Sequence, residues 1–339
     1  MTGLLALERC PLCERAAADA SPIYAPRGGV AIDRCRGCGL AFASHYAASA
    51  VIGADYAARA DRDVDPEPGA AASGERPGVA RRRVQLRLYD RLSRGRIGRP
   101  HPGSRALDVG CNTGLLLDAL RELGYVTAGI ERSPAYHLAA AAGHAIVQAD
   151  IEEADERGDR YDLITITHVL EHLARPVAAL RWIGRHLADA GLAVIEVPNF
   201  ADLARPLWGA AYRPLELGDH LIFFERETLQ AAIERAGLRV LELWSAPQTA
   251  TMVFPSALTA VDLGLGLARR LRGRGAPTIE RDVAGPSGLD RSARVRGGGR
   301  LSAIVEPMVA ALGSLDALLE RGFGAECRWG ANLVAIVGR

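Results

Sequence analysis

The stretch with the clearest chemical meaning is Asp-x-Gly-x-x-x-Gly, formed by Asp108, Gly110 and Gly114. It follows an apolar run and directly precedes a periodic apolar segment, which predicts a buried strand, a tight turn and the start of a helix. In α/β proteins such a turn holds nucleotide-like ligands, because the N–H groups at a helix start bind negative groups. A pyrophosphate site would need Gly-x-Gly-x-x-Gly. Asn112 and Leu115 occupy the places of its second and third glycines, which argues against a dinucleotide.

Two acids follow the next strands of the predicted sheet. Glu131 ends the second strand, 21 residues after Gly110, where an acid can accept hydrogen bonds from both hydroxyls of a ribose. The structural alternative is a helix cap, but Ser133 is the better cap. Asp150 follows the third strand in a loop that is crowded with other acids.

The fourth strand runs into His-x-x-Glu-His, with histidines at positions 168 and 172. These letters match the inverted zinc-protease motif, which requires a continuous helix that places both histidines on one face. Here a β-branched strand leads straight into the motif and Pro176 follows closely, so the protease interpretation fails. We expect His168 to line a ligand pocket. His172 could face a ligand or act only as a packing histidine.

A polar and aromatic loop follows the fifth strand and contains Asn199 and His220. Loops at the carboxyl ends of parallel strands are where open α/β sheets bind their ligands. A neutral histidine there could take a proton from a hydroxyl or amine. We therefore name His220 and His172 as candidate catalytic residues, with loop ordering as the alternative role for His220.

Four cysteines near the N-terminus form two Cys-x-x-Cys pairs, Cys10 with Cys13 and Cys35 with Cys38. Each pair can grip one ion, and four thiolates close a tetrahedral site that leaves no position open for catalysis. The pattern predicts a structural zinc ion. The alternative is a set of buried or redox-active cysteines.

Alternating strand and helix patterns surround these residues. Repeated βα units predict an α/β fold with a doubly wound, mostly parallel seven-stranded sheet. No clear crossover helix directly precedes the last strand, so it could run antiparallel. The expected strands are Arg105–Val109, Val126–Glu131, Ala145–Gln148, Tyr161–Thr167, Gly191–Val197, Arg239–Trp244 and Asn332–Val337, and the helices between them are Leu115–Leu123, Ala135–Ala142, Pro176–Leu187 and Glu227–Ala236.

Together these motifs resemble the class I S-adenosylmethionine-dependent methyltransferases, in particular bacterial ones with an N-terminal zinc-binding segment. Those enzymes are related to sugar C-methyltransferases and, through the core alone, to ubiquinone-biosynthesis O-methyltransferases. The chain stops after its seventh strand and so departs from the sugar C-methyltransferases, which have an extra C-terminal domain. The resemblance implies that S-adenosylmethionine is bound by Asp108, Gly110, Cys111, Asn112, Gly114, Glu131, Asp150 and His168.

We divide the chain accordingly into a zinc-binding module (1–45), a linker with a helical lid (46–100), a Rossmann-like core that binds S-adenosylmethionine (101–247), a helical insertion that covers the substrate (248–325) and the last strand (326–339). The lid contains an amphipathic segment, Val79–Ile97, with apolar residues at helical spacing and several arginines. We expect it to pack on the core with a solvated arginine face; an RNA-binding face is the alternative.

Composition limits the partners. The formal net charge is +1, which argues against nucleic acid as the main partner. The sequence contains neither a secretory signal pattern nor an apolar run long enough to span a bilayer, so we expect a cytoplasmic protein. The apolar segment Leu258–Leu271 has a basic end and could lie on a membrane surface.

The resemblance implies methyl transfer to a small-molecule acceptor, such as a sugar or secondary metabolite with a hydroxyl, amine or carbon nucleophile. The transfer would be an in-line displacement that leaves S-adenosylhomocysteine. Two other functions stay open: an RNA methyltransferase whose zinc module recognises RNA, and a non-catalytic scaffold that only binds the cofactor.

Overall fold

The computed structural model describes residues 4–24, 31–43, 45–47, 76, 78–152, 154, 158–202, 205–206, 215, 219–246 and 330–339. The predicted insertion at 248–325 and residues 61–75 of the predicted linker lie outside the described residues.

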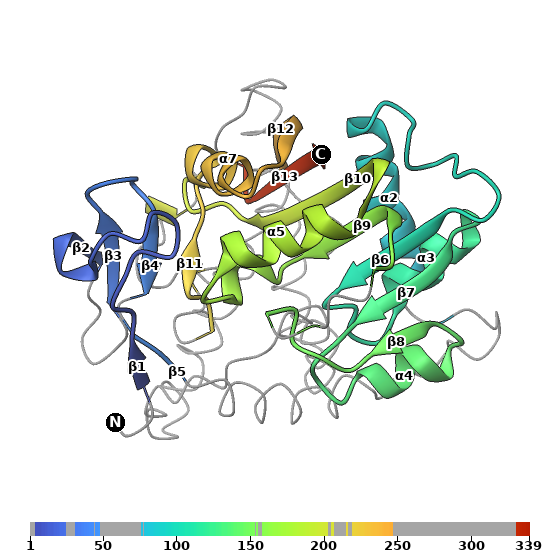
Figure 1. Ribbon diagram of the computed structural model, residues 1–339, viewed down its shortest axis with the longest axis horizontal. Coiled ribbons are helices and arrows are strands. Elements are labelled where there is room, and N and C mark those ends of the chain that lie inside the picture. Colours follow the sequence, from blue (N-terminus) through green and yellow to red (C-terminus); the bar gives the residue numbers. More distant parts are fainter. Residues whose placement is uncertain are drawn as a thin grey trace, which may run out of the picture.

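A seven-stranded sheet forms the centre of the structure, in the order β12-β13-β10-β9-β6-β7-β8 (Figure 1). β13 pairs antiparallel with both of its neighbours, and the remaining strands run parallel to one another. The predicted mostly parallel sheet and its antiparallel last strand are therefore confirmed. The strands are β6 (Arg105–Val109), β7 (Val126–Ile130), β8 (Ala145–Val147), β9 (Tyr161–Thr167), β10 (Leu187–Pro198), β12 (Arg239–Ala246) and β13 (Asn332–Gly338).

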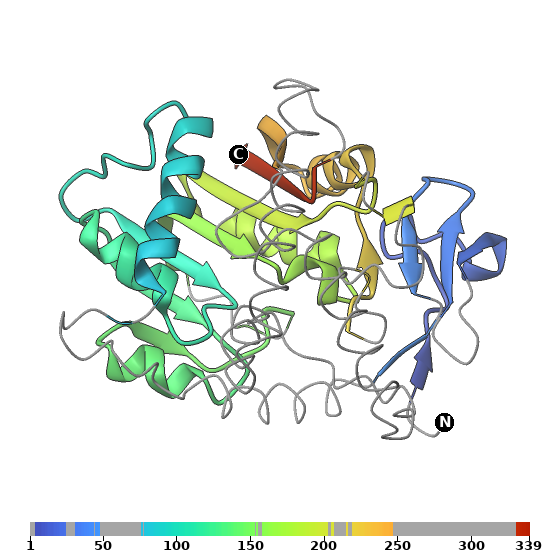
Figure 2. The same ribbon diagram turned by 180° about the vertical axis from the view of Figure 1, so that it is seen from behind.

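Helices cover both faces of this sheet, because side chains of each strand alternate between the two faces. In β6, Leu107 and Val109 join one hydrophobic cluster and Ala106 joins the other. The first cluster includes α5 (Pro176–His186) and α7 (Arg226–Arg235), which Figure 1 shows in front of the sheet. The second cluster includes α2 (Val79–Leu92), α3 (Leu115–Glu122) and Ala139 of α4 (Tyr136–Ala141). Figure 2 shows α2 crossing the opposite face of the sheet.

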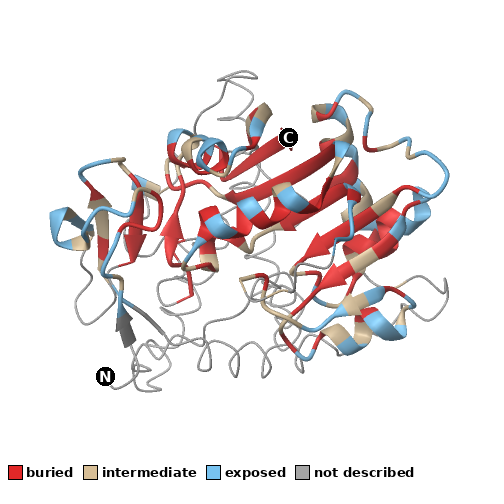
Figure 3. Ribbon diagram, in the orientation of Figure 1, coloured by how far each residue is buried: buried red, intermediate tan, exposed pale blue. Residues whose placement is uncertain are grey.

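Most residues of the central strands are buried (Figure 3). Strands that are covered on both faces need continuous apolar runs rather than alternating ones. β13 and the second half of β10 meet this requirement, since residues 193–195 and 333–335 are fully buried.

Two element boundaries differ from the sequence expectation by four residues or more, and several others differ by one or two. β10 begins at Leu187 rather than at Gly191, because Leu187 already pairs with Tyr161 before a register shift. The lid helix α2 ends at Leu92, and its buried face contains Leu86 and Tyr89, whereas Val84 is 49% exposed.

A second sheet joins the N-terminal segment to the main domain, in the order β11-β4-β3-β2. Its last three strands come from the cysteine-containing segment: β2 (Ala20–Tyr24), β3 (Ile32–Cys35) and β4 (Ala41–Ala43). β11 (Ile222–Phe223) comes from the loop that contains His220 and pairs antiparallel with β4. The N-terminal segment and this loop therefore share one sheet.

A side-chain contact and a short strand pair complete this connection. Arg34 of β3 forms a two-pronged ion pair with Glu225, which precedes α7. β1 (Leu4–Ala6) pairs with β5 (His45–Ala47) at the edge of the segment. No helix among the residues described above is long and apolar enough to cross a membrane.

Candidate active site

The turn after β6 has a backbone that few residue types tolerate. Gly110 has φ +75°, and a Cβ atom there would lie 2.3 Å from Cγ2 of Val169. Asn112 has φ +48°, a conformation that asparagine adopts more readily than most residues. The N–H groups of Gly110 and Cys111 both donate to the carbonyl oxygen of Ile130. The turn is thus held against the end of β7 on one side and against the loop after β9 on the other.

Gly114 serves the packing of the helix that follows. It has φ +84°, and a Cβ there would lie 2.9 Å from Cβ of Ala139 and 3.2 Å from the ring of His144. The second glycine of the motif therefore lets α3 begin in direct contact with α4.

Glu131 connects the turn to the end of β7. Its carboxylate accepts the N–H of Asn112 at 2.8 Å and the N–H of Ser133 at 2.7 Å, and the residue is only 7% exposed. The hydroxyl of Ser133 accepts the N–H of Ala135, but the N-cap of α4 is Ala135, without a side-chain cap, so the expectation that Ser133 caps this helix is wrong. Because each carboxylate oxygen can accept more than one hydrogen bond, Glu131 keeps acceptor capacity for a ligand.

Asp150 contacts Arg132, which follows Glu131 in the chain. Its carboxylate contacts Arg132 at 3.2 Å and accepts the N–H of Glu152 at 3.1 Å. The loops after β7 and β8 are joined by this ion pair.

Asp108 is a buried acid directly beneath the turn. It accepts a hydrogen bond from the hydroxyl of Thr165 at 2.7 Å and is 4% exposed. Burial raises its pKa to about 7, and the Thr165 hydroxyl offsets only part of this effect. Burial also raises the pKa of the neighbouring Cys111 thiol, which packs where a Cβ on Gly129 would lie.

His168 begins the loop after β9 and lies between two buried carboxylates. Its Nε2 is 3.1 Å from Glu196 and its Nδ1 is 3.4 Å from Glu171. Burial disfavours the charged ring, but the two carboxylates outweigh it and raise the pKa of His168 to about 10. For Glu171, burial opposes ionisation, while the His168 ring and two further histidines lower its pKa to about 2.

The sequence did not predict the residues that form hydrogen bonds to Glu196. Glu196 accepts hydrogen bonds from the hydroxyl of Tyr89 and from the amide of Gln85, both on α2. Both are buried, and burial together with Glu196 raises the pKa of Tyr89 well above its ordinary value. The only sign of this contact in the sequence was a polar residue among the buried positions of α2. The predicted lid helix therefore braces the loop after β9.

The two candidate catalytic histidines meet on the other side of Glu171. The rings of His172 and His220 are 4.8 Å apart in an edge-on contact, and Nε2 of His220 is 4.0 Å from Glu171. His172 lies in the short 3-10 helix η3 (Leu170–His172), and its Nδ1 is 2.9 Å from the carbonyl oxygen of Asp219. The N–H of Leu221 donates to the carbonyl of Glu171, which joins the two loops.

A small pocket adjoins His220. Its lining includes Asn199 and Phe200 from the loop after β10, and Phe223 of β11. The side chain of Asn199 donates to the carbonyl of Gly330 at 2.7 Å and accepts the N–H of Ala201, so it braces the pocket wall.

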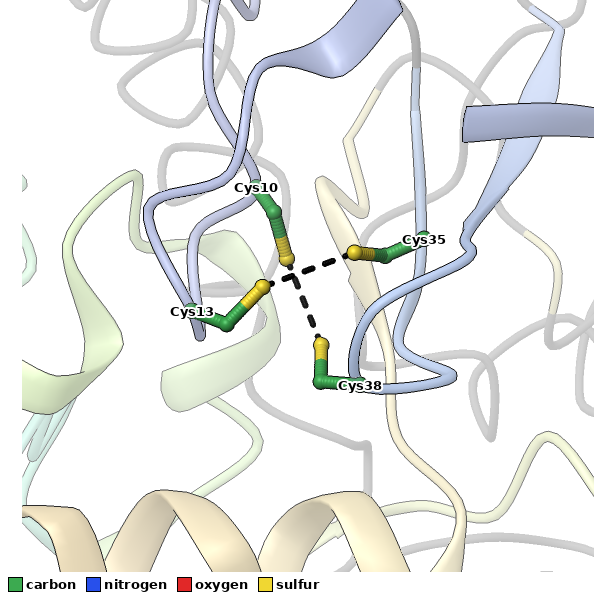
Figure 4. A group of neighbouring side chains, drawn as sticks. All are labelled: Cys10, Cys13, Cys35 and Cys38. Carbon is green, nitrogen blue, oxygen red and sulfur yellow. Dashed lines mark hydrogen bonds between the residues drawn. The ribbon is translucent and has the colours of Figure 1, made fainter. Parts of the chain in front are cut away.

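The four N-terminal cysteines converge from two loops (Figure 4). Their sulfurs all lie within 4.8 Å of one another, with Cys10 and Cys38 at 3.5 Å and Cys13 and Cys35 at 3.5 Å. Four thiolates around zinc would be about 3.8 Å apart. All four are free cysteines. Burial raises the pKa of the Cys35 thiol, but hydrogen bonds from backbone N–H groups outweigh burial and lower this pKa to about 7. The donor set fits a tetrahedral zinc ion.

Comparison with known families agrees with this geometry. The sequence profile of the family described as "Methyltransferase domain" matches residues 79–243, from the start of α2 into β12. Residues 79–243 belong to the methyltransferase family. The seven-stranded sheet, in which β13 runs antiparallel to both of its neighbours, has the order expected for the Rossmann-like methyltransferase fold.

Curated relatives of this methyltransferase domain include two ubiquinone biosynthesis O-methyltransferases. The one from Azorhizobium caulinodans is 30% identical over 159 residues, which cover 43% of this chain and 62% of the relative. The one from Caulobacter sp. is 31% identical over 127 residues, covering 35% and 49%. The chain thus matches about half to three-fifths of their length.

Among solved structures, an S-adenosylmethionine-dependent methyltransferase from Archaeoglobus fulgidus is 16% identical, with a TM-score of 0.44, over 76% of this chain and 92% of that one.

The fold brings the predicted residues into three groups. The turn after β6 and Glu131 form one group, and Asp150 adjoins it through Arg132. His172 and His220 form the second around Glu171, and Val169 links it to the turn by packing on Gly110. The ring of His168 points to Glu171 and Glu196. The four cysteines form a separate third group.

Proposed function

We propose that this methyltransferase transfers the methyl group of S-adenosylmethionine to a small-molecule acceptor. The observation that carries the proposal is the turn after β6, held by Glu131 at the carboxyl ends of β6 and β7. This is the place where open α/β sheets bind nucleotide-like ligands.

On the donor side, Glu131 would hold the ribose and Asp150 the adenine amino group. The carboxylate of Asp108 would compensate the positive charge of the cofactor's ammonium group. The N–H groups at the start of α3 would bind the cofactor's carboxylate. Gly110, Cys111, Asn112 and Gly114 shape the turn, and His168 orders the loop that closes over it. When bound, S-adenosylmethionine supplies a methyl group on a sulfonium leaving group.

On the acceptor side, the rings of His172 and His220 would remove a proton from the acceptor. The Asp219 carbonyl can only accept, so Nδ1 of His172 carries a hydrogen and Nε2 of the neutral ring keeps a lone pair. Glu171 would stabilise the positive charge that develops on either ring. The pocket beside His220 is our candidate for the acceptor.

We also propose that the four cysteines hold a structural zinc ion. The metal would hold the knuckles beside β3 and β4, and through the β4–β11 pairing it would support the loop that contains His220. Paired thiolates of this kind are also our reason to expect a cytoplasmic protein.

A labelled-methyl assay tests the proposal. The full chain is incubated with S-adenosylmethionine that carries a labelled methyl group and with sugars, phenols, amines, peptides or RNA. We expect label on a small molecule, with transfer reduced in both Glu131→Gln and His220→Asn. His137→Ala, on the exposed surface of α4, is the control. Calorimetry showing that the protein does not bind S-adenosylhomocysteine would refute the donor assignment, and label on RNA alone would refute the acceptor class.

A further inference from the structure

We propose that Arg76 is a positioning residue for the cofactor, which holds the donor turn (residues 110–114) and neutralises an acid beside it. Arg76 lies just ahead of α2, and its carbonyl accepts the N–H of Val79 in the first turn of that helix. Its guanidinium contacts a different element: one nitrogen donates to the carbonyl of Thr113, and the other is 2.7 Å from the carboxylate of Asp118 in α3. This role rests on the proposed methyl transfer, because the cofactor concerned is S-adenosylmethionine.

The contact with Thr113 holds the donor turn from a second side. On the first side, the carboxylate of Glu131 accepts the N–H of Asn112. Arg76 donates to the carbonyl of the next residue along the chain. Asn112 has φ +48°, a conformation that costs free energy in a residue other than glycine and persists only when its surroundings hold it. Arg76 and Glu131 therefore act together to keep the backbone that leads into α3 in one conformation.

The contact with Asp118 removes an electrostatic obstacle to cofactor binding. Asp118 lies in the first turn of α3, and its side chain is only 10% exposed. The proposed function assigns the carboxylate of the cofactor to the N–H groups at this same end of α3. Two negative charges at one helix end repel each other, and burial strengthens the repulsion because less water screens it. Without a cation, Asp118 would therefore weaken binding of the cofactor.

Two arginines bind the carboxylate of Asp118, and Arg76 is the more buried of them. Arg76 contacts one carboxylate oxygen and Arg121 contacts the other, each at 2.7 Å. The side chain of Arg76 is 32% exposed and that of Arg121 is 47% exposed, so solvent screens the first pair less. Arg121 also donates to the carbonyl of Ala142, whereas the second contact of Arg76 is on the donor turn. Arg76 thus combines both effects in one side chain.

A buried histidine orients Asp118 from the interior. Nε2 of His144 is 3.1 Å from Asp118, and Nδ1 is 2.7 Å from the hydroxyl of Thr127 in β7. Burial lowers the pKa of His144, although the hydrogen bond with Asp118 opposes this shift. A neutral ring donates to Asp118 and accepts from Thr127, so it fixes the carboxylate while the arginines supply the positive charge. Cδ2 of His144 would also lie 3.2 Å from a Cβ on Gly114, which places this network directly against the donor turn.

Calorimetry with two ligands tests the inference. S-adenosylhomocysteine carries the carboxylate, whereas 5′-methylthioadenosine has the adenosine and the sulfur but no amino-acid portion. We expect Arg76→Ala to weaken binding of S-adenosylhomocysteine about tenfold or more and to leave binding of 5′-methylthioadenosine unchanged. Arg83→Ala is the matched control, because Arg83 forms a two-pronged ion pair with Glu122 between the same two helices. The control should leave both affinities unchanged.

Two further variants separate this role from a loss of folding. Asp118→Asn removes the charge that Arg76 neutralises, and its amide oxygen can still accept from His144. Added to Arg76→Ala, it should restore part of the lost affinity for S-adenosylhomocysteine, which a purely structural defect would not allow. Arg76→Lys keeps the charge but not the two-pronged geometry, and its affinity should lie between those of wild type and Arg76→Ala.

The outcomes distinguish this inference from the proposed function. Equal affinity of wild type and Arg76→Ala for S-adenosylhomocysteine would overturn the role of Arg76 alone. An equal loss of affinity for both ligands would also overturn it, because the effect would then not depend on the carboxylate. Failure of the wild type to bind S-adenosylhomocysteine would refute the proposed function, and the role of Arg76 with it.

Discussion

Replacing Asp108 by asparagine should stabilise the protein and weaken cofactor binding. The carboxyl is 4% exposed and its one hydrogen-bond donor is the Thr165 hydroxyl, 2.7 Å away. An asparagine oxygen can accept the same hydrogen bond, so the substitution removes the charge while keeping the contact. What it also removes is the negative charge that we assign to the cofactor's ammonium group.

The magnitude follows from the pKa of Asp108, which burial raises from 3.8 to about 7. Between these two pH values the folded protein keeps a proton that the unfolded chain releases, so the free energy of unfolding falls as the pH rises and levels off above about 7. At pH 8 the buried carboxylate therefore costs about 4 kcal/mol. At pH 5 the cost is roughly 1.5 kcal/mol, because there only the unfolded chain is mostly ionised.

The assay is urea unfolding of wild type and Asp108→Asn at pH 5 and pH 8. Subtracting the two proteins at each pH cancels the other titrating groups. The variant should be more stable at both values, and its advantage should grow by roughly 2–3 kcal/mol between them. Calorimetry at pH 8 should show weaker binding of S-adenosylmethionine. An advantage that does not change with pH would refute the assignment of a buried, titrating carboxyl at this position.

Three further predictions concern the other parts of the site. Glu131→Gln should weaken S-adenosylhomocysteine binding roughly 10–100-fold in calorimetry while the circular dichroism spectrum stays unchanged; equal affinity would contradict the ribose assignment. Tyr89→Phe leaves the buried Glu196 one donor short and should lower the free energy of unfolding by about 1–3 kcal/mol in urea. Zinc removal, or Cys13→Ser, should speed hydrogen exchange in Ile222–Phe223, which pair with β4, but not in β6; unchanged exchange at β11 would contradict the support that we infer.

Much of the fold could be read from local patterns. The strands β6 and β9 have the bounds that the sequence predicts. Each is an apolar run that ends at a glycine or at the start of a helix, and such a pattern depends on neighbouring residues alone. The turn after β6 follows from its two glycines. The convergence of the four cysteines follows from their paired spacing, which is typical of metal-binding knuckles.

Only the tertiary structure decided how the acceptor side is assembled. Glu196 accepts a hydrogen bond from Tyr89, 107 residues earlier in the chain, and also contacts the ring of His168. The pairing of β11 with β4 likewise joins the His220 loop to the N-terminal segment. The local sequence patterns of α2 and of the two-residue strand β11 do not predict which distant residues they contact. The sequence by itself determined the donor turn, because neighbouring residues form it; the burial and pairing of Glu171 depend on chain folding that brings distant segments into contact.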